Sequence, residues 1–175
     1  VAWVAVLVGV FVLLRGGVFG LSSAPLRLWS GLILTIWLSI FGIAAGYPLG
    51  LALALGRRSV MPLVKWFSIA WIELVRGVPL VSILIMASVV LPLFLPEGTD
   101  IDNLLRAQVA FTMFASAYLA EVFRGGLQAV PSGQYEGAQS LGLGYWPTLR
   151  LIVLPQALKL VIPAQVNTFI AIFKD

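Results

Sequence analysis

Residues 28–56 read LWSGLILTIWLSIFGIAAGYPLGLALALG, a run of 29 residues without a charged side chain. At a rise of 1.5 Å per residue, a helix of this length spans about 43 Å, which exceeds the hydrocarbon core of a bilayer. The composition of the whole chain agrees: 61% of its 175 residues are hydrophobic, only 10% are charged, and the mean hydropathy is +1.04. Soluble domains carry about a quarter charged residues. The sequence therefore predicts an all-α integral membrane protein.

Four further apolar segments are candidates for membrane helices. They are residues 1–14, 77–96, 107–120 and 160–173. The second segment is long enough for one crossing. The last two are shorter, and each becomes a crossing if the neighbouring Arg106 or Lys159 extends its charged end to the membrane surface. With the first segment as a partial N-terminal transmembrane helix, we expect about five transmembrane helices.

The residue types that are missing exclude several classes of site. The chain has no Cys and no His, which excludes disulfides, thiolate or imidazole metal sites, Cys nucleophiles and His general bases. We therefore predict neither a catalytic site nor a metal site. The net charge of +4 comes from dispersed basic residues, which favours membrane orientation over nucleic-acid binding. Because the chain lacks an initiator Met and stops directly after an apolar run, we expect a fragment.

The distribution of charge predicts which side of the membrane each loop faces. The segment GRRSVMPLVKW at residues 56–66 contains three basic residues, whereas EGTDIDN at residues 97–103 is acidic and contains none. Lys and Arg concentrate on the cytoplasmic side, so the first segment lies inside and the second outside. The next crossing, about 104–120, then returns inward, which places residues 121–150 in the cytoplasm.

Three glycines in the first long apolar run share one helix face. Gly42, Gly46 and Gly50 recur every four residues, which allows a second helix to approach closely. The alternative is a moving hinge, since Pro48 removes one helical hydrogen bond between them. Residues 59–74 combine a basic start with aromatic residues, and this pattern is typical of an interfacial helix.

Residues 121–150 form a polar region rich in Gly and Pro between two apolar runs. We expect a short helix at about 133–141, with Ser132 as its N-cap and Gly142 ending it in the left-handed conformation. Pro147 fits the first turn of the next helix. The short helix would present a stripe of Tyr135, Ala138 and Leu141. An apolar stripe outside the membrane indicates a groove on another protein as its partner.

A spaced motif overlaps this predicted helix. It consists of Glu136, Gly137, Ala138, Gly142, Ile152, Leu154 and Pro155. The spacing matches E-A-A-x₃-G-x₉-I-x-L-P, with Gly137 in place of the usual first Ala, and so resembles the transmembrane subunits of ABC importers. The surrounding residues AYLAEVFRGGLQAVPSGQYEGAQSLGLGYWPTLRLIVLPQAL, together with IELVRGVPL and the terminal FKD, resemble the polar amino acid uptake permeases of the histidine/glutamine permease-like family. The resemblance covers residues 29–175 and is to the general L-amino acid permease branch.

This resemblance implies an ABC importer transmembrane-domain fold over residues 28–175, truncated at the C-terminus, with a cytoplasmic coupling region at 121–150. The motif residues would dock on a separate ATP-binding cassette subunit. That subunit would bind ATP and Mg, since no Lys of this chain closes a phosphate-binding loop and the chain itself would bind no cofactor. The resemblance also implies a bacterial inner membrane location, an amino acid substrate, a second permease subunit in a homo- or heterodimer, and a soluble periplasmic or extracellular substrate-binding protein.

Polar residues near the predicted crossings are candidates for the substrate path. They are Glu73, Arg76, Gln165, Asn167, Thr168, Lys174 and Asp175. Three of them follow Pro163, which breaks a helix, and broken helices contact zwitterions in transporters; the alternative is interhelical hydrogen bonding. Arg76 could bind a carboxylate or pair with Glu73 three residues away. The last two residues could meet the charged groups of an amino acid or lie at the outer headgroups.

Two other classes of protein share part of this pattern. An ion channel or a structural membrane subunit that is not driven by ATP would also be helical and apolar, but would need no ATP-binding partner. A membrane enzyme would need a nucleophile such as Ser88 or Ser116 beside a Lys, and no Lys lies at a suitable depth. We therefore expect a transport subunit and not an enzyme.

Overall fold

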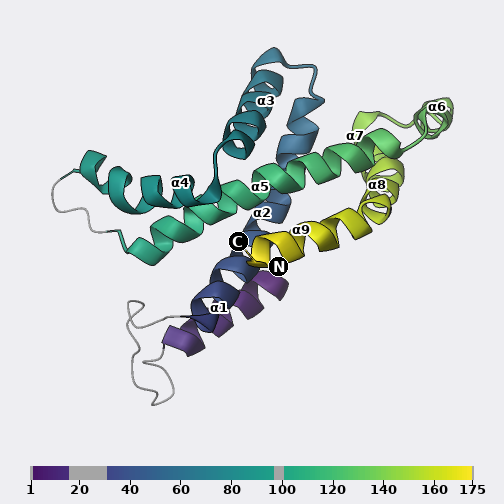
Figure 1. Ribbon diagram of the computed structural model, residues 1–175. Coiled ribbons are helices and arrows are strands. Elements are labelled where there is room, and N and C mark those ends of the chain that lie inside the picture. The colour runs from purple at the N-terminus through teal and green to yellow at the C-terminus, as the bar shows by residue number, and fades with distance from the viewer. Residues whose placement is uncertain (1, 16–30, 97–100, 175) are drawn as a thin grey trace.

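The computed structural model describes residues 2–15, 31–96 and 101–174, and these are helical with short connections. The elements are α1 Ala2–Arg15, α2 Leu32–Arg57, α3 Pro62–Gly77, α4 Leu80–Ile85, the π-helix η2 Met86–Val90, the 3₁₀-helix η3 Leu91–Phe94, α5 Asn103–Ala129, α6 Ser132–Ser140, α7 Tyr145–Pro147, the π-helix η4 Thr148–Val153, α8 Leu154–Leu160 and α9 Ile162–Lys174. Figure 1 shows the long helix α5 crossing α2, with α6 standing apart at one end of α5.

The packing of α2 against α5 forms the centre of the molecule. A Cβ atom added at Gly50 would lie 2.8 Å from the carbonyl oxygen of Ser116, and one added at Gly46 would lie 3.1 Å from the Cβ of Ala115. Only residues without a side chain allow two helix backbones to approach this closely. The structure therefore confirms the close packing predicted from the glycines, and Pro48 lies inside one continuous helix.

The segment predicted as one crossing at residues 77–96 begins at a sharp bend and is not a uniform α-helix. It follows α3 after a bend of 102°, and it changes from α-helix to π-helix to 3₁₀-helix. Pro92 has no N–H to donate to the carbonyl of Ser88, four residues earlier. Instead the Nη1 of Arg106 donates to this carbonyl at 3.1 Å. Arg106 therefore satisfies the carbonyl that Pro92 leaves free, and its predicted position at the membrane surface stays a prediction.

In the described part of the chain, one helix, Ile33–Arg57, is long and apolar enough to cross a membrane. Two pairs of consecutive helices are joined at a sharp bend, and the number of candidate spans rises to three if each pair counts as one span. The first bent pair is α3 with the segment Leu80–Phe94. The predicted number of about five crossings stays a prediction. α3 leaves Trp66 and Phe67 exposed, as an interfacial helix would.

The last apolar segment is broken where the sequence predicts it. The helical stretch Tyr145–Leu160 meets α9 at an angle of 59°, and Pro163 is the second residue of α9. One hydrophobic cluster joins α5 to this stretch, with Phe123 and Leu127 of α5 packed against Val153 and Ala157. The cluster fixes the platform from which α6 projects.

Candidate functional site

The short helix α6 begins one residue earlier than predicted. Pro131 occupies the N-cap position with extended backbone, and Ser132 is the first helical residue without a side-chain capping bond. The prediction of Ser132 as N-cap is therefore wrong. Proline fixes φ near −65° and directs the chain out of α5, so it sets the start of α6 by geometry rather than by a side-chain hydrogen bond. α5 accordingly continues through Gly125 and Gly126 and ends at Ala129.

Gly142 ends α6 in the left-handed conformation, as predicted, with φ of +73°. The backbone N–H of Gly142 donates to the carbonyl of Gln139 at 2.9 Å, and the N–H of Leu143 donates to the carbonyl of Ala138 at 3.0 Å. This pair of bonds is a Schellman motif, which satisfies carbonyls at the end of the helix. Glycine at this position therefore determines the direction in which the chain leaves α6.

The motif residues on α6 face opposite directions. Glu136 and Gly137 are exposed, whereas the side chain of Ala138 is buried at 2% exposure. Leu141 is 79% exposed, so it does not share the buried side of Ala138. The predicted stripe of Tyr135, Ala138 and Leu141 is thus split, because the helix ends before Leu141 completes it.

The rest of the motif lies at the junction of η4 and α8. Ile152 and Leu154 are half-buried, and Pro155 is exposed in the first turn of α8. The intervening Val153 is fully buried in the cluster that contains α5. These residues shape the base that carries α6.

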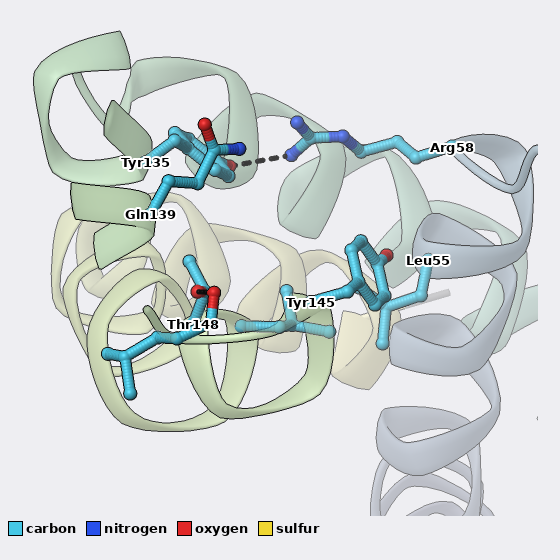
Figure 2. Close-up of a pocket in the computed structure, with 8 residues that line it drawn as sticks. Leu55, Arg58, Tyr135, Gln139, Tyr145 and Thr148 are labelled. Carbon is cyan, nitrogen blue, oxygen red and sulfur yellow. Dashed lines mark hydrogen bonds between the residues drawn. The ribbon is translucent and has the colours of Figure 1, made fainter. Parts of the chain in front are cut away.

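A cavity of about 230 Å³ separates α6 from the end of α2. It is lined by Leu55, Arg58, Tyr135, Gln139, Leu143, Tyr145, Thr148 and Leu149. Figure 2 shows the guanidinium of Arg58 reaching across to the hydroxyl of Tyr135, to which its Nη1 donates at 3.1 Å. The same Nη1 donates to the backbone carbonyl of Leu127 in α5 at 3.3 Å.

A cluster of charged residues lies where α2, α3 and α5 meet. Glu121 of α5 accepts from Arg57 at 2.7 Å and from Nε of Arg124 at 2.8 Å, and it lies 3.8 Å from Arg76. Glu73 pairs with Arg57 at 3.2 Å. Pairing with Glu73 was one of two alternatives for Arg76, and in the described part of the chain the carboxylate near Arg76 is instead that of Glu121. Three residues along a helix bring two side chains near each other, but here α5 offers Arg76 a less exposed carboxylate.

Glu121 lies just beyond the predicted crossing at 104–120, and two opposing effects act on its pKa. Burial raises the pKa of Glu121, but the hydrogen bond from Arg124 and the charges of Arg124, Arg57 and Arg76 outweigh burial, so the pKa is lowered overall. Sequence reasoning did not assign this cluster. The signal was the pair Glu121 and Arg124 at the end of an apolar run, where charges are costly unless they are paired.

The remaining candidate path residues do not form one group with this cluster. Gln165 of α9 is buried and donates to the hydroxyl of Tyr47 at 3.3 Å, and Thr168 donates to the carbonyl of Ala164 at 2.9 Å. Asn167 and Lys174 are exposed, and Asp175 lies outside the described residues. The bond of Gln165 to Tyr47 is the interhelical hydrogen bond that the sequence left as an alternative.

Known proteins resemble this chain over most of its length. Residues 46–175 match the family described as "Binding-protein-dependent transport system inner membrane component". The chain is 59% identical over 163 residues to the inner membrane amino-acid ABC transporter permease protein YhdY of Escherichia coli (strain K12), which covers 93% of this chain and 44% of that protein. It is 52% identical over 161 residues to the glutamate/glutamine/aspartate/asparagine transport system permease protein BztC of Rhodobacter capsulatus, which covers 88% of this chain and 37% of that protein. The chain thus spans less than half the length of these two relatives.

The arrangement of the helices also resembles a solved structure. The crystal structure of an amino acid ABC transporter with histidines superposes with a TM-score of 0.72 at 36% sequence identity. The superposition covers 82% of this chain and 66% of that chain. A match over this share of the chain concerns the arrangement of several helices, and not only single helices.

Proposed function

The chain belongs to the family of binding-protein-dependent transport system inner membrane components, and from this membership we propose that it is the permease part of an ATP-driven amino acid importer. Its fold is that of an ABC transporter transmembrane domain, as the sequence predicts. It is a multi-pass inner membrane protein. The observation that carries the proposal is the helix α6, which stands apart from the other helices and exposes Glu136 and Gly137.

In this proposal α6 is the coupling helix that docks on a separate ATP-binding cassette subunit. Glu136, Gly137 and Leu141 supply the exposed contact surface, and Ala138 anchors the helix from the inside. Gly142 gives the turn that the left-handed backbone requires. The remaining motif residues, Ile152, Leu154 and Pro155, support the contact by shaping the base of the loop.

The division of labour between subunits follows from the same family membership. The partner subunit binds ATP and Mg and performs hydrolysis, and this chain binds no cofactor and acts as a transport subunit. A second permease subunit, identical or homologous, completes the path across the membrane. A soluble substrate-binding protein on the outer side delivers the substrate.

A polar amino acid is the substrate in this proposal. Support comes from the relatives, whose names specify amino acids, among them glutamate and glutamine. The candidate path contains the amides of Gln165 and Asn167 and the hydroxyl of Thr168, all on the broken last helix, as well as the charged ends of Glu73 and Arg76. Lys174 and Asp175 remain candidates for the charged groups of the amino acid.

The test uses the full-length gene product, purified with the products of its neighbouring genes. Wild type, Glu136→Gln and Glu136→Lys are reconstituted into proteoliposomes with the ATP-binding subunit and the substrate-binding protein. We expect ATP-dependent uptake of labelled glutamate or glutamine by the wild type. Glu136→Lys should reduce uptake by about tenfold or more, because a reversed charge in an interface costs several kcal/mol.

Glu136→Gln keeps the size of the side chain and removes only its charge, so its uptake should lie between the two. If no ATP-binding subunit copurifies with the wild type and uptake ignores ATP, the coupling proposal is wrong. An ATP-independent flux would then point to a channel, and no flux to a structural subunit.

A further inference from the structure

The helix α6 is attached to the rest of the chain in two different ways. On one side it is packed: α6 contacts η4, Ala138 is buried, and Leu143 follows directly through the Schellman turn. The Nε2 of Gln156 in α8 also donates to the Oε1 of Gln134 in α6 at 2.9 Å. Close packing transmits displacement, because interiors are hard to compress. A movement of α6 therefore carries η4 and α8 with it.

On the other side α6 faces the 230 Å³ cavity, and the half-buried Tyr135 also packs against the hydrophobic cluster that contains Leu127 of α5. In the described part of the chain, the side-chain hydrogen bond that joins α6 to the end of α2 is the bond from Arg58 to Tyr135. Arg58 is the C-cap residue of α2, and its guanidinium carbon lies 5.7 Å from the ring centroid of Tyr135. The second bond of the same Nη1 reaches Leu127 in α5. A single guanidinium thus connects α2, α5 and α6, and Figure 2 shows its bond to Tyr135.

We propose that Arg58 is a positioning residue that transmits movement of α6 to the end of α2, and that Tyr135 is its contact on α6. This inference rests on the proposed function, in which α6 is moved by an ATP-binding subunit. The cavity leaves room for α6 to move toward or away from α2. The hydrogen bond across the cavity limits that freedom and makes the end of α2 follow.

This arrangement predicts a specific defect when the bond is lost. The packed side would still move η4 and α8, and it would move α5 through the hydrophobic cluster that joins them, whereas the end of α2 would lose its direct bond to α6. The ATP-binding subunit would still dock on the exposed face of α6 and would still hydrolyse ATP. Uptake per ATP hydrolysed would therefore fall. A general loss of folding would instead lower uptake and ATP hydrolysis together.

The experiment compares variants of the full-length permease in proteoliposomes with its ATP-binding subunit and substrate-binding protein, using labelled glutamate or glutamine. Tyr135→Phe removes the hydroxyl and keeps the ring, and Arg58→Gln removes the guanidinium. Tyr145→Phe is the matched control, since Tyr145 lines the same cavity and the structure gives its hydroxyl no hydrogen bond within the described residues. Uptake, ATP hydrolysis, copurification of the ATP-binding subunit and thermal stability are measured for each.

We expect Tyr135→Phe and Arg58→Gln each to lower uptake per ATP by about three- to tenfold, the range that residues in coupling networks produce. The double variant should be no worse than Arg58→Gln alone, because both changes remove the same bond. Tyr145→Phe should match the wild type.

The outcomes separate this inference from the function on which it rests. If the wild type shows no ATP-dependent uptake, the proposed function fails. If the wild type transports but Tyr135→Phe and Arg58→Gln keep its uptake per ATP, the transmission role of Arg58 is refuted while the proposed function stands. A fall in uptake per ATP that is equally large in Tyr145→Phe would also refute it, because the cavity and not the bond would then be responsible.

Discussion

Two adjacent glycines near the end of α5 provide a sharp test of the packing between α5 and α8. A Cβ atom added at Gly126 would lie 2.7 Å from the carbonyl oxygen of Ala157 and would also contact the side chain of Val161. A Cβ atom added at Gly125 would meet no atom within 4 Å outside its own helix. The obstacle at Gly126 includes backbone, which cannot move aside without shifting α8. We therefore expect Ala to be tolerated at Gly125 and resisted at Gly126.

Two effects determine the difference in unfolding free energy between Gly125→Ala and Gly126→Ala, and one of them is common to both variants. Replacing Gly by Ala inside a helix stabilises it by about 1 kcal/mol, and this gain applies to both positions. Overpacking a close contact costs about 1–3 kcal/mol, and this cost applies only to Gly126. The free energy of unfolding of Gly126→Ala should therefore lie about 1–3 kcal/mol below that of Gly125→Ala.

The assay is thermal unfolding of the two full-length variants, purified in the same detergent. At about 2–4 °C per kcal/mol, Gly126→Ala should unfold roughly 2–12 °C below Gly125→Ala. The wild type should lie at or below Gly125→Ala. If Gly126→Ala is as stable as Gly125→Ala, α5 and α8 do not approach as closely as described, and the argument from the backbone contact is wrong.

Two further comparisons test the charged cluster and the end of α6. Glu121→Gln should lower the free energy of unfolding by about 1–3 kcal/mol, because it removes charged hydrogen bonds from partly buried arginines. Glu73→Gln should change the free energy of unfolding by less than about 1 kcal/mol, because the side chain of Glu73 is 59% exposed. Since the pKa of Glu121 is lowered in the folded chain, its stabilisation is present above the ordinary value of 4.5 and is lost as the pH falls through the folded-state value. Chemical unfolding of wild type and Glu121→Gln at several pH values measures this loss. If the difference in unfolding free energy between the two proteins does not shrink on acidification, the argument is contradicted. Gly142→Ala should lower the free energy of unfolding by about 1–2 kcal/mol because φ is +73°. Gly144→Ala should be close to neutral, because Gly144 has a φ of −71° and open space around it. Equal stabilities of these two variants by thermal unfolding would show that the left-handed turn is not needed.

Several features of the fold followed from short stretches of sequence. The charge-free run at 28–56 predicted the helix α2, Gly142 predicted the left-handed end of α6, and Pro163 predicted the break before α9. Each depends on residues within one or two helical turns. For that reason the pattern of residue types was sufficient to predict them.

Other expectations failed or changed because they depended on distant residues. Helical spacing offered Glu73 as one of two possible partners for Arg76, but Arg76 lies 3.8 Å from Glu121 on another helix. The guanidinium of Arg106 binds the carbonyl that Pro92 leaves free, a contact that sequence spacing did not indicate. The partners of long charged side chains are chosen among all the elements that surround them, and sequence spacing describes only one of those elements.

The sequence by itself determined the class of this protein and the position of its spaced motif. Both depend on composition and local spacing, which the bilayer and the backbone convert directly into helices and turns. The tertiary structure alone decided that Ala138 faces inward, that three arginines surround Glu121, and that Arg58 reaches Tyr135 across 77 residues. These contacts exist only once α2, α5 and α6 are packed, because packing brings together side chains that are far apart along the chain.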